Sequence, residues 1–405
     1  MRTLIKNGHV VDFKTKLDKV VDVMIEDDKV IAIGNVGDTA DTIIDAEGLY
    51  VVPGLVDMHC HLRDPGFIHK EDIETGIKSA SRGGFTSIAC MPNTKPVIDS
   101  KETIEYIVNK AKMQNSVNVY PIACITKNME GNELTDMAGL KSAGAVAVSD
   151  DGKPVVSARV MKSGMIEALK NNLTIISHCE EVTISEGRES EEIMASRETI
   201  LAKDNDLKVH IAHISTEMSV EIVRHAKKIG TKVTAETCPH YFSITEEKIK
   251  EKGTDAQMNP NLRKDADVKA IIEGIKDGTI DAIATDHAPH SKEEKMSDNA
   301  PNGIIGFETA LKLVITYLID KGHIDYMKLV ELMCYNPARL LNIDKGTLEV
   351  NKTADITIFD PNVEKEYKTE DIVSKSKNSP FTEMLLNGEI QYTIINGKVV
   401  YCAKN

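Results

Sequence analysis

The chain has 405 residues, of which 41% are hydrophobic and 28% are charged. This composition is ordinary for a globular protein and excludes intrinsic disorder and collagen-like repeats. The net charge of −14 argues against a nucleic-acid partner, because nonspecific affinity for the phosphate backbone comes from cationic surface. No apolar run reaches the roughly 18 residues of a membrane helix, and residues 1–8 lack the apolar core of a signal peptide. We therefore expect a cytoplasmic protein with no membrane partner.

Both ends of the chain have the pattern of short β-strands. Candidate strands rich in β-branched residues span 4–8, 20–25, 30–34, 354–359, 392–395 and 398–401. Asn7-Gly8 and Asn396-Gly397 predict hairpin turns. Because domain termini often lie close together, we expect a small β-sandwich domain formed by residues 1–52 and 346–405.

Between these ends, short apolar runs alternate with amphipathic stretches, which is the pattern of repeated βα units. Strands covered on both faces are predicted at 54–59, 86–91, 117–125, 145–149, 174–178, 208–213, 232–237 and 281–285. Helices are predicted at 72–81, 101–113, 158–170, 191–202, 218–229, 266–276 and 307–319. The sequence therefore predicts an α/β fold, a TIM-like (β/α)8 barrel over residues 53–345.

Side chains that can bind metals fall at the carboxyl ends of these strands, where barrel enzymes build their active sites. The end of the first strand carries His59 and His61, which share a face because side chains two apart on a strand point the same way. Later strands end near Asp150, Asp151, His178, His213 and Asp286. A lone histidine is more often structural than a ligand, but this joint placement predicts a metal centre. Imidazole and carboxylate groups suit zinc, manganese or cobalt.

Residues 53–61, Pro-Gly-Leu-Val-Asp-Met-His-Cys-His, resemble the signature of the amidohydrolase superfamily. That superfamily joins a metallo-hydrolase barrel to a small sheet domain formed by both termini. Motifs that resemble its type I dihydroorotases span residues 61–66, 91–94, 149–152, 259–263 and 285–290. The resemblance implies reversible, metal-dependent hydrolysis of the cyclic amide of (S)-dihydroorotate to N-carbamoyl-L-aspartate, a step of de novo pyrimidine (UMP) biosynthesis.

The resemblance also implies two divalent metal ions, zinc before manganese or cobalt. The implied ligands are His59, His61 and Asp286 for the first ion, Asp151 as the bridge, and His178 and His213 for the second. Asp150 competes for the bridging position, but neighbours on a strand face opposite ways, and we favour Asp151. His210 is expected to face away from the site.

Asp286 is the implied catalytic residue. The two ions would acidify a water and polarise the amide carbonyl. Asp286 would take the proton and deliver it to the ring nitrogen, because an unprotonated amide anion is a very poor leaving group. The alternative is that Asp286 serves only as a metal ligand.

The residues implied to bind substrate are His61, Arg63, Asn93, Asn259, His290, Asn302 and Gly303. Arg63 can fork both oxygens of the substrate carboxylate, a geometry that lysine cannot match. The family's Phe-Gly pair is replaced here by Asn302-Gly303, which leaves the role of Asn302 open. The polar run 291–302 is either an exposed loop or a mobile cover over the substrate.

Other functions stay open at this stage. An allantoinase or a hydantoinase/dihydropyrimidinase would use the same machinery with a different pocket, but the bridging Asp151, Arg63 and Asn93 argue against them. An inactive barrel could serve as a scaffold for aspartate transcarbamoylase, but such a barrel would lack ligands. The expected partner is the small-molecule substrate, and a homodimer or a complex with aspartate transcarbamoylase stays open.

Overall fold

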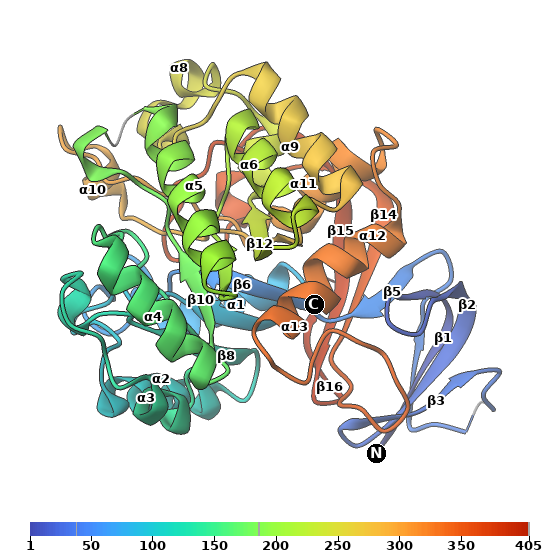
Figure 1. Cartoon of the computed structure of the whole chain (residues 1–405). Coiled ribbons are helices and arrows are strands. Elements are labelled where there is room, and N and C mark those ends of the chain that lie inside the picture. The colour runs from blue at the N-terminus through green and yellow to red at the C-terminus, as the bar shows by residue number, and fades with distance from the viewer. Residues whose placement is uncertain (38, 185–186, 404–405) are drawn as a thin grey trace.

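The computed structural model describes residues 1–37, 39–184 and 187–403, and two eight-stranded sheets organise it (Figure 1). The first sheet is parallel, and its strands neighbour one another in chain order. They are β6 (Leu55–Cys60), β7 (Phe85–Cys90), β8 (Asn118–Ala123), β9 (Ala147–Val148), β10 (Thr174–Ser177), β11 (Lys208–Ile211), β12 (Lys232–Thr237) and β13 (Ala282–Ile283). A bridge between Cys60 and His287 joins β6 to the segment after β13, so the sheet nearly closes into a barrel.

Helices surround this barrel (Figure 1). The longer ones are α1 (Ile73–Arg82), α2 (Lys101–Gln114), α3 (Met137–Ala143), α4 (Ala158–Lys170), α5 (Arg188–Asp204), α6 (Glu217–Lys228) and α9 (Asp265–Asp277). The shorter ones are α7 (Pro239–Ser243), α8 (Lys248–Lys252), α10 (Lys292–Lys295), α11 (Ala310–Val314), α12 (Tyr326–Val330) and α13 (Asn336–Leu340). The predicted alternation of strands and helices is confirmed, with α3 added and with a π-helical segment, Ile315–Ile319, continuing α11.

Local sequence explains where the helices begin. Asp72 accepts a hydrogen bond from the Thr75 backbone N–H while the Thr75 hydroxyl faces back to Asp72, which forms a capping box at α1. Thr216 caps α6 by accepting from the Ser219 N–H. Each helix then turns its apolar residues to the barrel, such as Ile77 of α1, which is buried.

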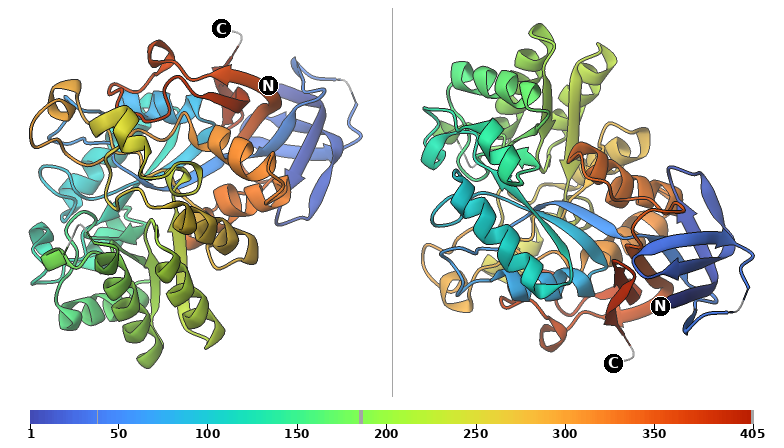
Figure 2. Two further views of the ribbon diagram at one scale, coloured as in Figure 1. Left: turned by 90° about the horizontal axis from the view of Figure 1, so that it is seen from above. Right: turned by 90° about the horizontal axis from the view of Figure 1, so that it is seen from below.

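The second sheet is built from both ends of the chain, as predicted. Its strands are β1 (Arg2–Asp12), β2 (Leu17–Glu26), β3 (Lys29–Gly34), β4 (Thr42–Asp45), β5 (Tyr50–Pro53), β14 (Ile356–Glu366), β15 (Leu385–Ile395) and β16 (Lys398–Cys402). β5 pairs in parallel with β1 and antiparallel with β14, which joins the two ends. Both termini lie on the same side of the molecule in the two views of Figure 2. The domain limits 1–52, 53–345 and 346–405 stay a prediction.

One of the two expected Asn-Gly turns is wrong. Asn396 and Gly397 have positive φ and connect β15 to β16, as predicted. Asn7 also has a positive φ of 61°, but β1 continues through it. The register with β2 shifts between Ile5 and Gly8, so this Asn-Gly pair forms a bulge inside a long strand.

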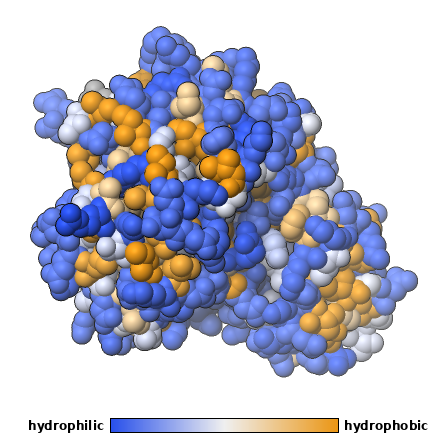
Figure 3. Space-filling view, in the orientation of Figure 1, coloured by the Kyte–Doolittle hydropathy of each residue, from blue (hydrophilic) through white to orange (hydrophobic). Residues whose placement is uncertain are grey.

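The face of the molecule drawn in Figure 3 is mainly polar. Figure 3 shows that hydrophilic residues cover most of the visible face, with apolar residues in small scattered groups. Within the described ranges, no helix combines the length and the apolar character needed to cross a bilayer.

Candidate metal centre and substrate pocket

Asp151 lies at the centre of a buried group of histidines at the carboxyl ends of the barrel strands. Its Oδ1 lies 3.4 Å from His59 Nε2, 3.4 Å from His178 Nδ1 and 3.7 Å from His213 Nε2. Its Oδ2 lies 3.5 Å from His61 Nε2. His59 belongs to β6, and the others follow β6, β9, β10 and β11 within three residues. The parallel strands therefore bring together side chains that are far apart in the sequence.

Two overlapping groups in this cluster have the geometry of metal ligands. The ligand atoms of His59, His61 and Asp151 lie within 4.8 Å of one another, and so do those of Asp151, His178 and His213. Asp286 Oδ1 lies 3.1 Å from His61 Nε2 and 3.6 Å from His59 Nε2. The six residues predicted as ligands thus meet at one place. Their roles as ligands stay a proposal.

The donor atoms also fit a metal chemically. His59 Nε2 and Asp151 Oδ1 are buried and have no hydrogen-bond partner among the described residues. Buried polar atoms are normally satisfied, so such orphans at a site are expected where a ligand completes the contacts. Imidazole nitrogens with carboxylate oxygens form the donor set that zinc prefers in hydrolases.

The charges in this cluster stabilise one another. Burial raises the pKa of Asp286, but the hydrogen bond with His61 and the charges of His59 and His61 outweigh it, so the pKa falls well below its ordinary value. Burial likewise raises the pKa of Asp151, and the neighbouring histidines reverse the effect. Both carboxylates are therefore ionised at neutral pH.

Two glutamates that the sequence analysis did not single out contact histidines of the cluster. Glu236 on β12 lies with Oε1 2.7 Å from His59 Nδ1 and Oε2 3.3 Å from His210 Nε2. Glu180 lies with Oε2 2.9 Å from His178 Nε2 and accepts from Asn259 Nδ2 at 3.2 Å. A carboxylate on the outer nitrogen keeps the proton there and leaves the other nitrogen free as a donor to metal. The sequence held a signal for each glutamate. For Glu236 it was the alternation of side chains along β12, and for Glu180 it was the position two residues after His178.

Residues expected outside the cluster do lie elsewhere. His210 Nδ1 lies 2.8 Å from the Thr234 hydroxyl, and the ring reaches the cluster only through Glu236. Asp150 accepts from the Thr126 backbone N–H at 3.1 Å and contacts the Thr126 hydroxyl. This contact turns the Asp150 carboxylate away from the histidines, which leaves Asp151 as the central carboxylate.

The backbone is strained where side chains enter the site. Arg63, His213 and Asp286 have φ values of 61°, 32° and 46°, a region that non-glycine residues rarely adopt. Asp57 compensates at one of these points, because its carboxylate accepts from the Thr285 N–H and hydroxyl at 3.0 and 2.6 Å, directly before Asp286. Strain of this kind persists where surrounding contacts fix the chain, and it clusters at functional sites.

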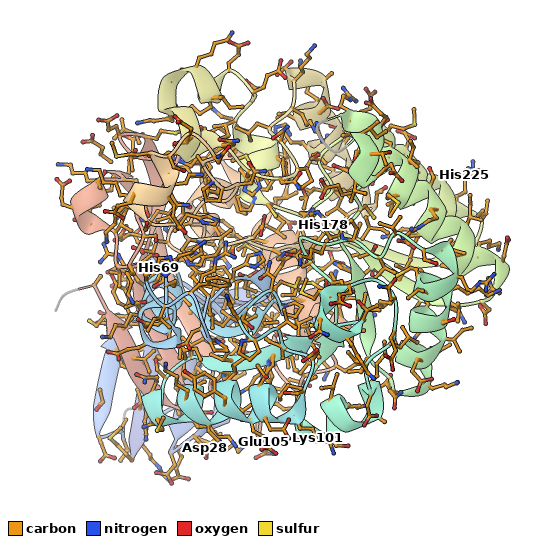
Figure 4. The ribbon with its side chains drawn as sticks, turned by 90° about the vertical axis from the view of Figure 1, so that its left-hand side faces the viewer. Asp28, His69, Lys101, Glu105, His178 and His225 are labelled. Carbon is orange, nitrogen blue, oxygen red and sulfur yellow. The ribbon has the colours of Figure 1, made fainter. Side chains whose placement is uncertain are left out.

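A cavity of about 260 Å³ opens above the cluster. The predicted substrate-binding residues all line it: His61, Arg63, Asn93, Asn259, His290, Asn302 and Gly303. Asp151, His178, His213 and Asp286 form part of its wall, so cluster and cavity share one space. In Figure 4, His178 lies among the side chains of the interior, whereas His225 lies on the outer helix. This volume suits a small ring compound better than a drug-sized ligand.

A buried lysine fastens the polar run that was expected to be an exposed loop or a mobile cover. The run contains the one-turn helix α10, and Lys295 at its end is only 3% exposed. Lys295 Nζ donates to the carbonyl oxygens of Gln257, Pro301 and Gly303 at 3.3, 2.9 and 3.0 Å. Burial lowers the pKa of this ammonium to about 8. These contacts place Gly303 at the cavity wall.

Comparison with known proteins agrees with this architecture. Residues 50–400 match the amidohydrolase family. A dihydroorotase of Acetivibrio thermocellus is 52% identical and covers 98% of each chain, and one of Clostridioides difficile is 46% identical over 99% of this chain and 100% of that one. Among solved structures, the L-hydantoinase of Arthrobacter aurescens is 26% identical, with a TM-score of 0.88 over 98% of this chain and 95% of that chain. The chain belongs to the amidohydrolase family and, within it, to the dihydroorotases, a group of hydrolases that act on cyclic amides.

Proposed function

We propose that this protein interconverts (S)-dihydroorotate and N-carbamoyl-L-aspartate at the cavity above Asp151, the reaction that serves pyrimidine biosynthesis. The observation that carries the proposal is the meeting of a metal-ligand cluster and a cationic side chain in one small cavity. The curated relatives named dihydroorotase support it over nearly the whole chain. We propose residues 53–345 as the catalytic domain, and residues 1–52 with 346–405 as the small domain.

Two divalent ions, zinc first, would bind around Asp151. His59, His61 and Asp286 would hold one ion, His178 and His213 the other, and Asp151 both. Such ions, when bound, acidify water near neutral pH and polarise a carbonyl oxygen.

Asp286 is placed to move the proton. Its carboxylate is ionised, lines the cavity, and is oriented by His61 Nε2 at 3.1 Å. In the hydrolytic direction it accepts a proton from the attacking water and donates it to the departing ring nitrogen. In the reverse direction it removes the proton from the carbamoyl nitrogen that closes the ring.

Arg63 would select the substrate. Its guanidinium lines the cavity, where its Nε donates to the Pro289 carbonyl oxygen at 3.1 Å and its Nη2 lies 3.1 Å from His290 Nε2. A planar guanidinium matches a carboxylate with two parallel hydrogen bonds. Dihydroorotate carries a carboxylate, whereas allantoin and hydantoin do not, so this residue favours the dihydroorotase reaction over those of the hydantoinases that share the fold.

The test is an assay of the zinc-loaded protein with dihydroorotate, allantoin and hydantoin, combined with metal analysis. We expect turnover of dihydroorotate alone. Arg63→Ala should raise KM for dihydroorotate by about 10- to 100-fold, because a charge-assisted contact is lost, without changing metal content. Arg224→Ala is the matched control, since Arg224 pairs with Asp277 on the outer surface. An unchanged kcat/KM in Arg63→Ala would reject the assignment.

The cellular context is also part of the proposal. A cytoplasmic location agrees with the composition. A homodimer and a complex with aspartate transcarbamoylase are the assemblies to examine, and light scattering of the protein with and without that enzyme tests both.

A further inference from the structure

One wall of the cavity contains a histidine whose two ring nitrogens face different partners. His290 Nδ1 lies 3.3 Å from Lys70 Nζ, and His290 Nε2 lies 2.9 Å from the Asn302 carbonyl oxygen. Arg63 Nη2 also lies 3.1 Å from His290 Nε2. Lys70 itself does not line the cavity, and its side chain is 13% exposed.

These partners decide where the ring carries its proton. An ammonium can only donate, so Nδ1 beside Lys70 must offer a lone pair. A carbonyl oxygen can only accept, so the Asn302 oxygen, which lies nearer to Nε2 than the Arg63 donor does, favours a hydrogen on Nε2. Both contacts are satisfied by the neutral ring with its proton on Nε2. The opposite tautomer would set two donors together at Lys70 and two acceptors together at Asn302.

The ring is neutral in this setting. Burial lowers the pKa of His290, and the positive charges of Arg63, Lys70 and Lys295 lower it further, to about 2. Among the described residues, the carboxylate of Glu294 faces the ring and opposes this shift, with Oε2 3.6 Å from Nδ1. Lys70 forms an ion pair with this carboxylate, with its Nζ 3.0 Å from Glu294 Oε1.

The proton on Nε2 leaves one contact of the pocket mismatched. Arg63 Nη2, which can only donate, then lies 3.1 Å from the protonated Nε2, whose single hydrogen faces the Asn302 carbonyl oxygen. Two donors that converge without an acceptor between them are relieved when an anionic oxygen enters. The pair is therefore set up for a carboxylate before substrate arrives.

We propose that Lys70 is a positioning residue that fixes the Nε2–H tautomer of His290. This hydrogen is then shared between the Asn302 carbonyl oxygen and the substrate carboxylate, to which Arg63 also donates. The inference rests on the proposed function, since that function supplies the carboxylate. Without Lys70, the freed Glu294 would draw the proton to Nδ1. Nε2 would then turn a lone pair toward the carboxylate, which repels it.

The test compares the zinc-loaded wild-type protein with Lys70→Met, Lys70→Arg and Lys375→Met. Lys375 is the matched control, because it fastens the same segment through the Ile68 carbonyl oxygen and Asp72 and does not touch the ring. The readouts are the ¹⁵N spectrum of His290, assigned with His290→Gln, and the steady-state constants for dihydroorotate.

We expect the Nε2–H form in the wild-type protein and in Lys375→Met, and a shift toward the Nδ1–H form in Lys70→Met. KM in Lys70→Met should rise about tenfold while kcat stays within about twofold, because binding rather than chemistry is affected. Lys70→Arg, which restores a donor, should restore both readouts. If Lys70→Met does not fold, Lys70→Ala, which also lacks a donor, replaces it with the same expectation.

Three results would overturn the inference: an Nδ1–H ring in the wild-type protein, an unchanged ring in Lys70→Met, or an equal shift in Lys375→Met. The spectrum is measured without substrate. A wild-type protein that shows the Nε2–H ring but does not turn over dihydroorotate would therefore reject the proposed function and leave the role of Lys70 in the tautomer standing.

Discussion

The two halves of the cluster around Asp151 are supported differently. In the inner half, His59 is backed by Glu236, which is fully buried and shared with His210, whereas His61 Nδ1 lies 2.9 Å from Asn93 Oδ1. The outer half, His178 with His213, is backed by Glu180, whose side chain is 15% exposed and holds Asn259 at the cavity. The carboxylate behind His59 therefore lies in the barrel core, whereas the carboxylate behind His178 lies at the cavity and contacts a residue proposed to bind substrate.

The largest effect should come from the carboxylate common to both halves. Asp151→Asn removes the one negative charge that faces all four histidines, so both metal positions should empty and turnover should fall to background. Metal analysis and a dihydroorotate assay measure this. Asp150→Asn is the control and should keep its metal, because Asp150 faces Thr126. A fully metallated, active Asp151→Asn variant would contradict the shared role.

The next effect concerns Asp286, which touches only the inner half. Asp286→Asn should lower kcat by about 10²- to 10⁴-fold through loss of the proton acceptor. The outer half should keep its metal, so activity should fall much further than metal content. Parallel losses of metal and activity would mean that Asp286 is a ligand only.

The two supporting glutamates should separate the halves directly. Glu236→Gln and Glu180→Gln should each weaken metal binding by about 10- to 100-fold, as expected when the partner of a ligand histidine is lost. Only Glu180→Gln should also raise KM, because Asn259 loses its anchor. Competition with a chelator and steady-state kinetics distinguish the two. Equal effects on KM would remove the distinction between the halves.

The smallest effect is a pH dependence of the metal-free protein. Burial lowers the pKa of His178, but hydrogen bonds with Asp151 and Glu180 outweigh it and raise the pKa to about 9. A pKa raised on folding contributes stability that is complete below the unfolded value, about 6.5, and is lost as the pH rises through about 9.

Chelator-treated protein should therefore lose stability to urea between about pH 6.5 and 9. Glu180→Gln should reduce this loss, because it removes one of the two hydrogen bonds that raise the pKa. A urea midpoint that does not change between these pH values in the chelator-treated wild-type protein would contradict the raised pKa of His178.

Sequence reasoning predicted the position of a side chain correctly where a regular rule of strand geometry determines it. His59 and His61 follow from the two-residue period of a strand, and Asp151, His178, His213 and Asp286 from the carboxyl ends of parallel strands. Those rules need only the strand positions, and all eight strands were predictable from their apolar runs.

It failed where long-range contacts decide the outcome. Asn7-Gly8 has the composition of a turn, but pairing with β2 continues the strand past it. Lys295 lies in a run without apolar periodicity, and only the folded chain brings three carbonyl oxygens around its ammonium. Glu180 and Glu236 gain their roles from contacts with His178 and His59, which composition does not reveal.

The central claim is that Asp151 joins two metal positions beneath a carboxylate-binding pocket. Anomalous diffraction at the zinc edge, from crystals soaked with dihydroorotate, tests it most directly. We expect two peaks, one on each side of the Asp151 carboxylate, with the ligand carboxylate between Arg63 and His290. Anomalous peaks away from Asp151, or a ligand turned with its carboxylate away from Arg63, would contradict the account.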